Sequence, residues 1–81
     1  MDPILVGHEL PAYRAVQKAI VTDNGIKFTV KSPMGQIITE EMEVSPDDYL
    51  CWAIGGVLIQ EAMPNLTPDQ RELLMTGLIF N

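Results

Sequence analysis

The chain is poor in the side chains on which metal sites and disulfide frameworks depend. It has one cysteine, Cys51, and one histidine, His8, in 81 residues. A single cysteine excludes an internal disulfide and is typical of a reducing compartment. His8 has no second histidine or cysteine nearby in sequence to make a metal site, which indicates a solvated surface residue. Pairing of Cys51 with His8 for catalysis would need a third, orienting group, and nothing in the sequence suggests one.

Basic residues are also scarce. The chain has 5 Lys and Arg against 11 Asp and Glu, which gives a formal net charge of −6. Phosphate backbones and anionic membrane surfaces are bound by clustered cations. We therefore expect neither nucleic acid nor a membrane as the partner. Because no set of reactive or metal-binding side chains is visible, we also expect no enzyme activity, cofactor or metal.

Long apolar runs are missing, although the chain is 47% hydrophobic. The longest nearly uncharged stretch, residues 49–60, is 12 residues long, against roughly 20 for a membrane span. The start, Met1-Asp2-Pro3, lacks the basic-then-apolar order of a signal peptide, so we expect a cytoplasmic protein. This much apolar material is difficult to hide in one small domain, and it favours association with a partner or a second copy.

Two turn signals divide the first half of the chain into strands. Asn24-Gly25 is typical of a two-residue type I′ turn, which would pair Val21 with Phe28 and Lys18 with Lys31. Residues 33–35, Pro-Met-Gly, indicate a three-residue loop with a left-handed glycine. The pairs predicted by this second turn are Val30 with Ile38, Thr29 with Thr39, Lys27 with Glu41 and Ile26 with Met42.

Both turns predict the same apolar face, in which Glu40 is the one misfit. Its members are Ala19, Val21, Ile26, Phe28, Val30, Ile38, Met42 and Val44. Agreement between turn chemistry and alternation indicates a three-stranded antiparallel meander. Residues 11–20 are also compatible with a short helix that has Pro11 in its first turn, but the hairpin needs a strand there.

The second half predicts two helices. Ser45 is a typical N-cap followed by Pro46, and this helix should run to about Met63. Thr67 and Gln70 have the spacing of a capping box, and this second helix should end near Thr76, with Gly77 as its cap. The fold class is therefore α+β in a single domain, 1–81. Its predicted parts are a flexible segment 1–10, a meander 12–44, two helices within 45–77 packed on one face, and an apolar tail 78–81.

Acidic residues gather where the meander meets the first helix, and they are the candidate partner-binding site. Its predicted residues are Glu41, Glu43, Asp47 and Asp48. One interpretation is a solvated strand edge followed by a helix start, where acids complement the helix dipole. Another is a ridge that docks on a basic protein surface. Metal binding has no ligand spacing in its favour.

The helix that contains Trp52 carries no charge from Leu50 to Ile59. Because a helix that is apolar all round must be buried on most sides, it indicates core packing, self-association or a partner groove with Trp52 as anchor. Cys51 on this helix is expected to be a buried packing residue. We predict a homodimer through this helix. The predicted contact residues are Trp52, Gly55, Gly56 and Ile59.

A separate basic face is the basis of an alternative function. Its residues are Arg14, Lys18, Lys27 and Lys31. Such a face is compatible with a small-ligand or nucleotide sink. No glycine-rich phosphate loop accompanies it.

Residues 52–77 resemble a pattern found in small uncharacterised phage proteins, including accessory proteins of the microvirus group. The matching positions are Trp52, Gly56, Ile59-Gln60, Met63-Pro64, Leu66-Thr67, Arg71-Glu72 and Thr76-Gly77. The resemblance implies a phage protein in the cytoplasm of an infected bacterium, without an assigned activity. Relatives often continue with an acidic, Trp-containing tail, whereas this chain has Leu78-Ile79-Phe80-Asn81. We expect a non-enzymatic accessory protein that modulates or inhibits a host protein by binding it, or one with a structural role in virion assembly.

Overall fold

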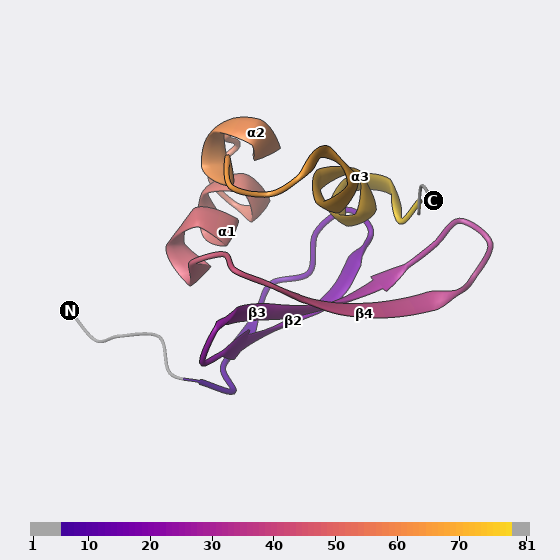
Figure 1. Ribbon diagram of the computed structural model, residues 1–81, viewed down its shortest axis with the longest axis horizontal. Coiled ribbons are helices and arrows are strands. Elements are labelled where there is room, and N and C mark those ends of the chain that lie inside the picture. The colour runs from indigo at the N-terminus through magenta and orange to yellow at the C-terminus, as the bar shows by residue number, and fades with distance from the viewer. Residues whose placement is uncertain (1–5, 79–81) are drawn as a thin grey trace.

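Four antiparallel strands and three helices form two layers, an α+β arrangement (Figure 1). A computed structural model describes residues 6–78. The strands are β1 Glu9–Leu10, β2 Val16–Thr22, β3 Gly25–Lys31 and β4 Ile37–Met42, and they lie in the order β1-β2-β3-β4. The helices are α1 Pro46–Ala53, α2 Ile59–Ala62 and α3 Pro68–Thr76. All three cover one face of the sheet, the arrangement that was predicted for two helices, and leave the other face open.

The sheet has one strand more than the predicted meander. Leu10 pairs with Ala19, Gly7 N donates to Val21 O, and Val21 N donates to His8 O. The segment predicted to be flexible therefore supplies β1, while residues 1–5 lie outside the described part of the chain. The strand interpretation of residues 11–20 is confirmed from Val16 onward, and a helix there is wrong.

The first turn has a different register from the predicted one. Thr22 pairs with Gly25 and Val21 with Ile26, so the two central residues are Asp23 and Asn24, and neither has a positive φ. Gly25 has another role: a Cβ on it would come within 2.1 Å of the Met42 carbonyl oxygen. Glycine is needed where the end of β4 approaches the backbone. Because the register shifts by two residues, the same side chains still face the core.

The two-residue shift also pairs Lys18 with Thr29, so the predicted pairing of Lys18 with Lys31 is wrong. A bulge follows nearer the start of β2. Val16 pairs with Val30 there, which leaves Gln17 as the extra residue. An extra residue re-aims the strand, and it lets Val16 join the buried face.

The second turn is confirmed in full. Ser32 N donates to Gln36 O, and Gly35 N donates to Ser32 O. Gly35 has a φ of 89°, the left-handed conformation that closes a three-residue loop. All four predicted pairs between β3 and β4 are present. Glu40 is exposed at the sheet edge, which explains why a charge is tolerated on the helix-covered face.

The predicted helix from Pro46 to about Met63 is broken into two. Its start is confirmed, because Ser45 Oγ accepts a hydrogen bond from Asp48 N. However, α1 ends at Ala53, and Gly56 takes a left-handed φ of 76° before α2 begins. Two consecutive glycines are poor helix formers. A Cβ at Gly56 would meet nothing within 4 Å, so it is the left-handed backbone and not close packing that favours glycine at this position.

Helix α3 follows its prediction. Thr67 Oγ1 accepts from Gln70 N while Gln70 Oε1 accepts from Thr67 N, which is the expected capping box. Gly77 caps the other end with a φ of 80° and donates its N–H to Leu73 O. A Cβ at Gly77 would come within 2.5 Å of the Lys31 carbonyl oxygen, so this glycine also permits the approach of α3 to the sheet.

The core lies between the helices and the inner sheet face. Tyr49 and Trp52 of α1 have ring centroids 5.9 Å apart, and Phe28 of β3 lies 5.3 Å from Tyr49. Every residue of the predicted apolar face is buried except Ile38, which is half-buried. Within the described residues, no helix is long and apolar enough to cross a membrane.

Candidate functional site

The outer edge of β4 is the first element of the site. In an antiparallel sheet, the backbone polar groups of successive residues point alternately to the two neighbouring strands. Val21 N donates to His8 O and Val21 O accepts from Gly7 N, both just before β1, and Lys31 N donates to the Ala15 carbonyl. It follows that Ile26, Phe28 and Val30 point their backbone N–H and C=O groups to β4. The β4 residues opposite them, which are Met42, Glu40 and Ile38, point theirs back to β3. The backbone N–H and C=O groups of Ile37, Thr39 and Glu41 therefore point away from the sheet, where no strand among residues 6–78 pairs with them.

This edge is acidic and exposed. Glu40 and Glu41 belong to β4, Glu43 follows it directly, and all three are exposed. β4 itself contains no basic residue. Glu41 and Glu43 share the open face of the sheet because side chains alternate along a strand. The strand edge and the negative charge therefore coincide.

A hollow of about 360 Å³ lies where β4 ends against α3, and we call it the strand-end hollow. It is lined by Glu41, Met42, Glu43, Asn65, Leu66 and Gln70. Asn65 donates its side-chain amide to the Glu43 carbonyl. That contact occupies the next outward-facing carbonyl after Glu41, and it fixes the loop before α3 to the end of the edge.

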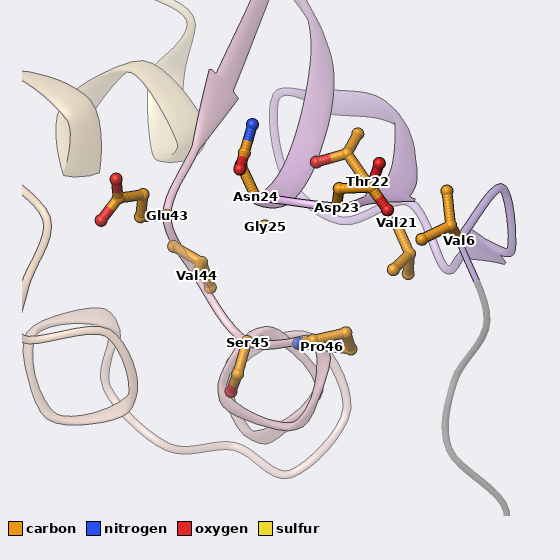
Figure 2. A pocket seen from close by; sticks show the side chains of 10 residues that line it. All are labelled: Val6, Val21, Thr22, Asp23, Asn24, Gly25, Glu43, Val44, Ser45 and Pro46. Carbon is orange, nitrogen blue, oxygen red and sulfur yellow. The ribbon is translucent and has the colours of Figure 1, made fainter.

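A second hollow of about 420 Å³, the hairpin hollow, lies on the other side of Glu43. Figure 2 shows the Asp23–Asn24 turn on one side of it, Ser45 and Pro46 opposite, and Val6 at its end. The other lining residues are Val21, Thr22, Gly25, Glu43 and Val44. Among the residues that line these two hollows, three are acidic (Asp23, Glu41, Glu43) and none is basic.

The structure brings together only part of the predicted partner-binding set. Glu41 and Glu43 line the same hollow, as the alternation predicts. Asp47 and Asp48 are exposed in the first turn of α1, just beyond Ser45 and Pro46, and line none of the hollows described here. Their place at the positive end of the helix dipole stabilises α1.

The predicted self-association residues divide between core and surface. Trp52 and Ile59 are each only 5% exposed, whereas Gly55 and Gly56 are exposed. Trp52, Gly56 and Ile59 line a third hollow of about 190 Å³, the aromatic hollow. Its remaining lining residues are Tyr13, Arg14, Val57, Leu58, Gln60 and Met75. The Tyr13 and Trp52 rings meet edge to face, with centroids 4.7 Å apart.

The predicted basic face is not gathered into a hollow. Lys18, Lys27 and Lys31 are exposed on the strands and line none of the three hollows described here. Arg14 lies in the turn before β2, next to Ala15, whose carbonyl accepts from the Lys31 N–H. Its guanidinium is 5.4 Å from the centroid of the Tyr13 ring. Arg14 has a φ of 53°, and no other non-glycine residue among 6–78 has a positive φ.

The only histidine and the only cysteine of the chain lie at the surface. His8 and Cys51 are both exposed, so the prediction of a buried cysteine is wrong: α1 turns Tyr49 and Trp52 inward and this position outward. No group of three or more His, Cys, Asp or Glu residues within 6–78 has the arrangement to hold a metal ion.

Sequence reasoning missed two residues of the site. Asn65 acts through a hydrogen bond that spans 22 residues, which a local pattern cannot show. Asp23 was visible as a turn residue, but its position near Glu43 depends on how the hairpin packs against the end of β4.

Comparisons of the chain with models of protein families, with curated proteins and with solved structures find no match. The function is therefore inferred from the geometry of the chain itself.

Proposed function

We propose that this chain is a small non-enzymatic binding protein that attaches to a basic surface of another protein. We call the contact region the acidic surface, formed by Glu41, Glu43, Asp47 and Asp48. The observation that supports it is the junction of two hollows at Glu43, where the lining residues include three acids and no base. Complementary charge speeds encounter and selects partners.

The resemblance to phage accessory proteins suggests the setting. In that setting the partner is a protein of the bacterial host, and binding modulates or inhibits it in the cytoplasm. A small acidic protein of this kind acts by occupying a surface. Glu41 and Glu43 are exposed side chains, and the residue opposite Glu41 on β3 is the exposed Lys27.

A matched pair of charge variants tests this proposal. Glu41→Lys/Glu43→Lys changes the net charge from −6 to −2, since each substitution adds two. Glu9→Lys/Glu61→Lys makes the same change at exposed acids outside the acidic surface. Affinity capture from bacterial lysate should recover one stoichiometric protein with the native chain and the control, and lose it with the first variant. Equal loss in both variants would show that only net charge matters, and would refute a specific surface.

Self-association is the second part of the proposal. Ile54 and Leu58 flank the two glycines between α1 and α2 and are 69% and 59% exposed. Two large apolar side chains this exposed on one turn favour contact with a second copy. Trp52 and Ile59 would support that contact from the core beneath it.

A further inference from the structure

We infer that the outer edge of β4 binds an extended, lysine- or arginine-rich segment of the partner as a fifth strand of the sheet. This inference rests on the proposed function, because it names the shape and chemistry of the segment that meets the acidic surface. Strand addition to an open sheet edge is a general mode of peptide recognition, in which backbone hydrogen bonds supply affinity and side chains supply specificity.

The backbone of β4 is arranged for such pairing. Thr39 and Glu41 point their N–H and C=O groups away from β3, and Ile37 does so at the start of the strand. Natural proteins commonly protect long edges with charged side chains, prolines or bulges. The charges on β4 are Glu40 and Glu41, which deter an acidic or apolar strand but attract a basic one. Residues 37–42 contain no lysine and no proline, and all six keep a regular register with β3.

The charges on this edge select a basic occupant. An added strand would place its side chains beside Glu41 on the open face and beside Glu40 on the helix-covered face, and Glu43 lies just beyond. At the other end, Ile37 is 62% exposed and Ile38 half-buried, so an apolar side chain fits there. If the β4 edges of two copies paired with each other, each copy would bring three glutamates to the contact. In an antiparallel pair these glutamates would lie beside the isoleucines of the other copy. A basic, β-forming peptide complements both halves of β4.

The end of the edge also sets where the added strand stops. Asn65 already donates to the carbonyl of Glu43, so pairing extends from Ile37 to Glu41 and no further. The occupant therefore needs about five residues in extended conformation, a segment of roughly 17 Å at about 3.4 Å per residue.

A blocked ten-residue peptide that alternates lysine and valine serves as the probe. Its binding to the full chain is measured by titration of backbone amide NMR signals and by hydrogen exchange. We expect exchange at Thr39 and Glu41 to slow by at least tenfold on binding. Ile38 and Glu40 are internal controls, because their N–H groups are already paired with β3. The same peptide with every amide N-methylated keeps its charge but has no backbone donor, and it should lose at least tenfold in affinity.

Variants of Thr39 separate strand pairing from simple charge attraction. Thr39→Pro removes an outward N–H without breaking a bond to β3, a position at which edge strands accept proline. It should weaken probe binding at least tenfold, whereas Thr39→Ala should bind as the native chain does. Thermal unfolding checks that both variants fold. If Thr39→Pro does not fold, the hydrogen-exchange experiment on the native chain still tests whether the probe pairs with β4.

The outcomes distinguish this inference from the proposed function. If Glu41→Lys/Glu43→Lys abolishes probe binding while Thr39→Pro and N-methylation leave it intact, strand addition is refuted and the acidic surface stands. If none of these changes weakens binding, both are refuted. If the native chain is a dimer and Thr39→Pro dissociates it, the β4 edge binds a second copy of the chain, and the inference is overturned.

Discussion

The hydroxyl group of Tyr49 donates a hydrogen bond of 2.5 Å to the carbonyl oxygen of Pro11, 38 residues earlier in the chain. Tyr49 belongs to α1 and Pro11 follows β1, so this bond ties the first helix to the start of the sheet. The ring is fully buried, and burial raises the pKa of Tyr49 from 10.0 to about 12.

The raised pKa of Tyr49 predicts a loss of stability at high pH. Between pH 10 and 12 the unfolded chain releases the phenolic proton while the folded chain keeps it, so the free energy of unfolding falls by about 1.4 kcal/mol per pH unit. Tyr49→Phe loses the hydrogen bond to Pro11 at every pH, at a cost of about 1 kcal/mol, but should show a flatter decline. Urea unfolding from pH 8 to 11.5 measures both slopes. If the free energy of unfolding falls with pH equally in the native chain and in Tyr49→Phe, Tyr49 is not the group responsible for the loss of stability.

Gly77→Ala should destabilise the protein more than Gly35→Ala. Both glycines have a φ between 80° and 89°, so an alanine pays a similar backbone cost at either position. At Gly77 the new Cβ would also lie 2.5 Å from the Lys31 carbonyl oxygen, whereas at Gly35 it meets nothing within 4 Å. We expect a difference of more than about 1 kcal/mol in chemical denaturation. Equal losses would mean that α3 does not press on the sheet at this point.

Thr67→Ala should remove the capping box of α3. We expect a cost of about 1 kcal/mol and a fall in melting temperature of about 4–8 °C. Gln70→Ala removes the reciprocal bond, and the double variant should cost less than the sum of the two, since they share one motif. Strict additivity in a thermal double-mutant cycle would contradict coupling between Thr67 and Gln70.

Self-association should depend on the turn between α1 and α2. Ile54→Ser/Leu58→Ser should convert a dimer into a monomer in light scattering at micromolar concentration, because it replaces two large exposed apolar side chains. Met34→Ser/Leu78→Ser is the control, since these two are also exposed but lie elsewhere. A mass of 9.0 kDa for the native chain would contradict the proposed dimer.

The parts of the fold that were predicted correctly depend on local chemistry. Ser45, Thr67 with Gln70, and Gly77 define helix ends through bonds that span a few residues. The loop at 33–35 sets the β3–β4 register for the same reason. The pairing of Glu41 and Glu43 on one face follows from strand alternation alone.

The parts that were missed depend on contacts between distant segments. Gly25 looks like a turn glycine, but it pairs with Thr22 at the start of β3 and lies against the backbone of Met42, so the predicted hairpin register is two residues off. β1 has only two residues, too short for a pattern. Asn65 enters the site through a bond to Glu43 that no spacing rule predicts.

The order of the strands has a consequence for the kinetics of folding. Each strand pairs with its neighbour in the chain, so every sheet contact closes a short loop, at low cost in chain entropy. Hairpins of this kind form in about 1–10 μs, and local topologies fold fast. The bond from Tyr49 to Pro11 closes a much longer loop, so we expect it to form after the rate-limiting step. In that case Tyr49→Phe should speed unfolding and leave the refolding rate unchanged.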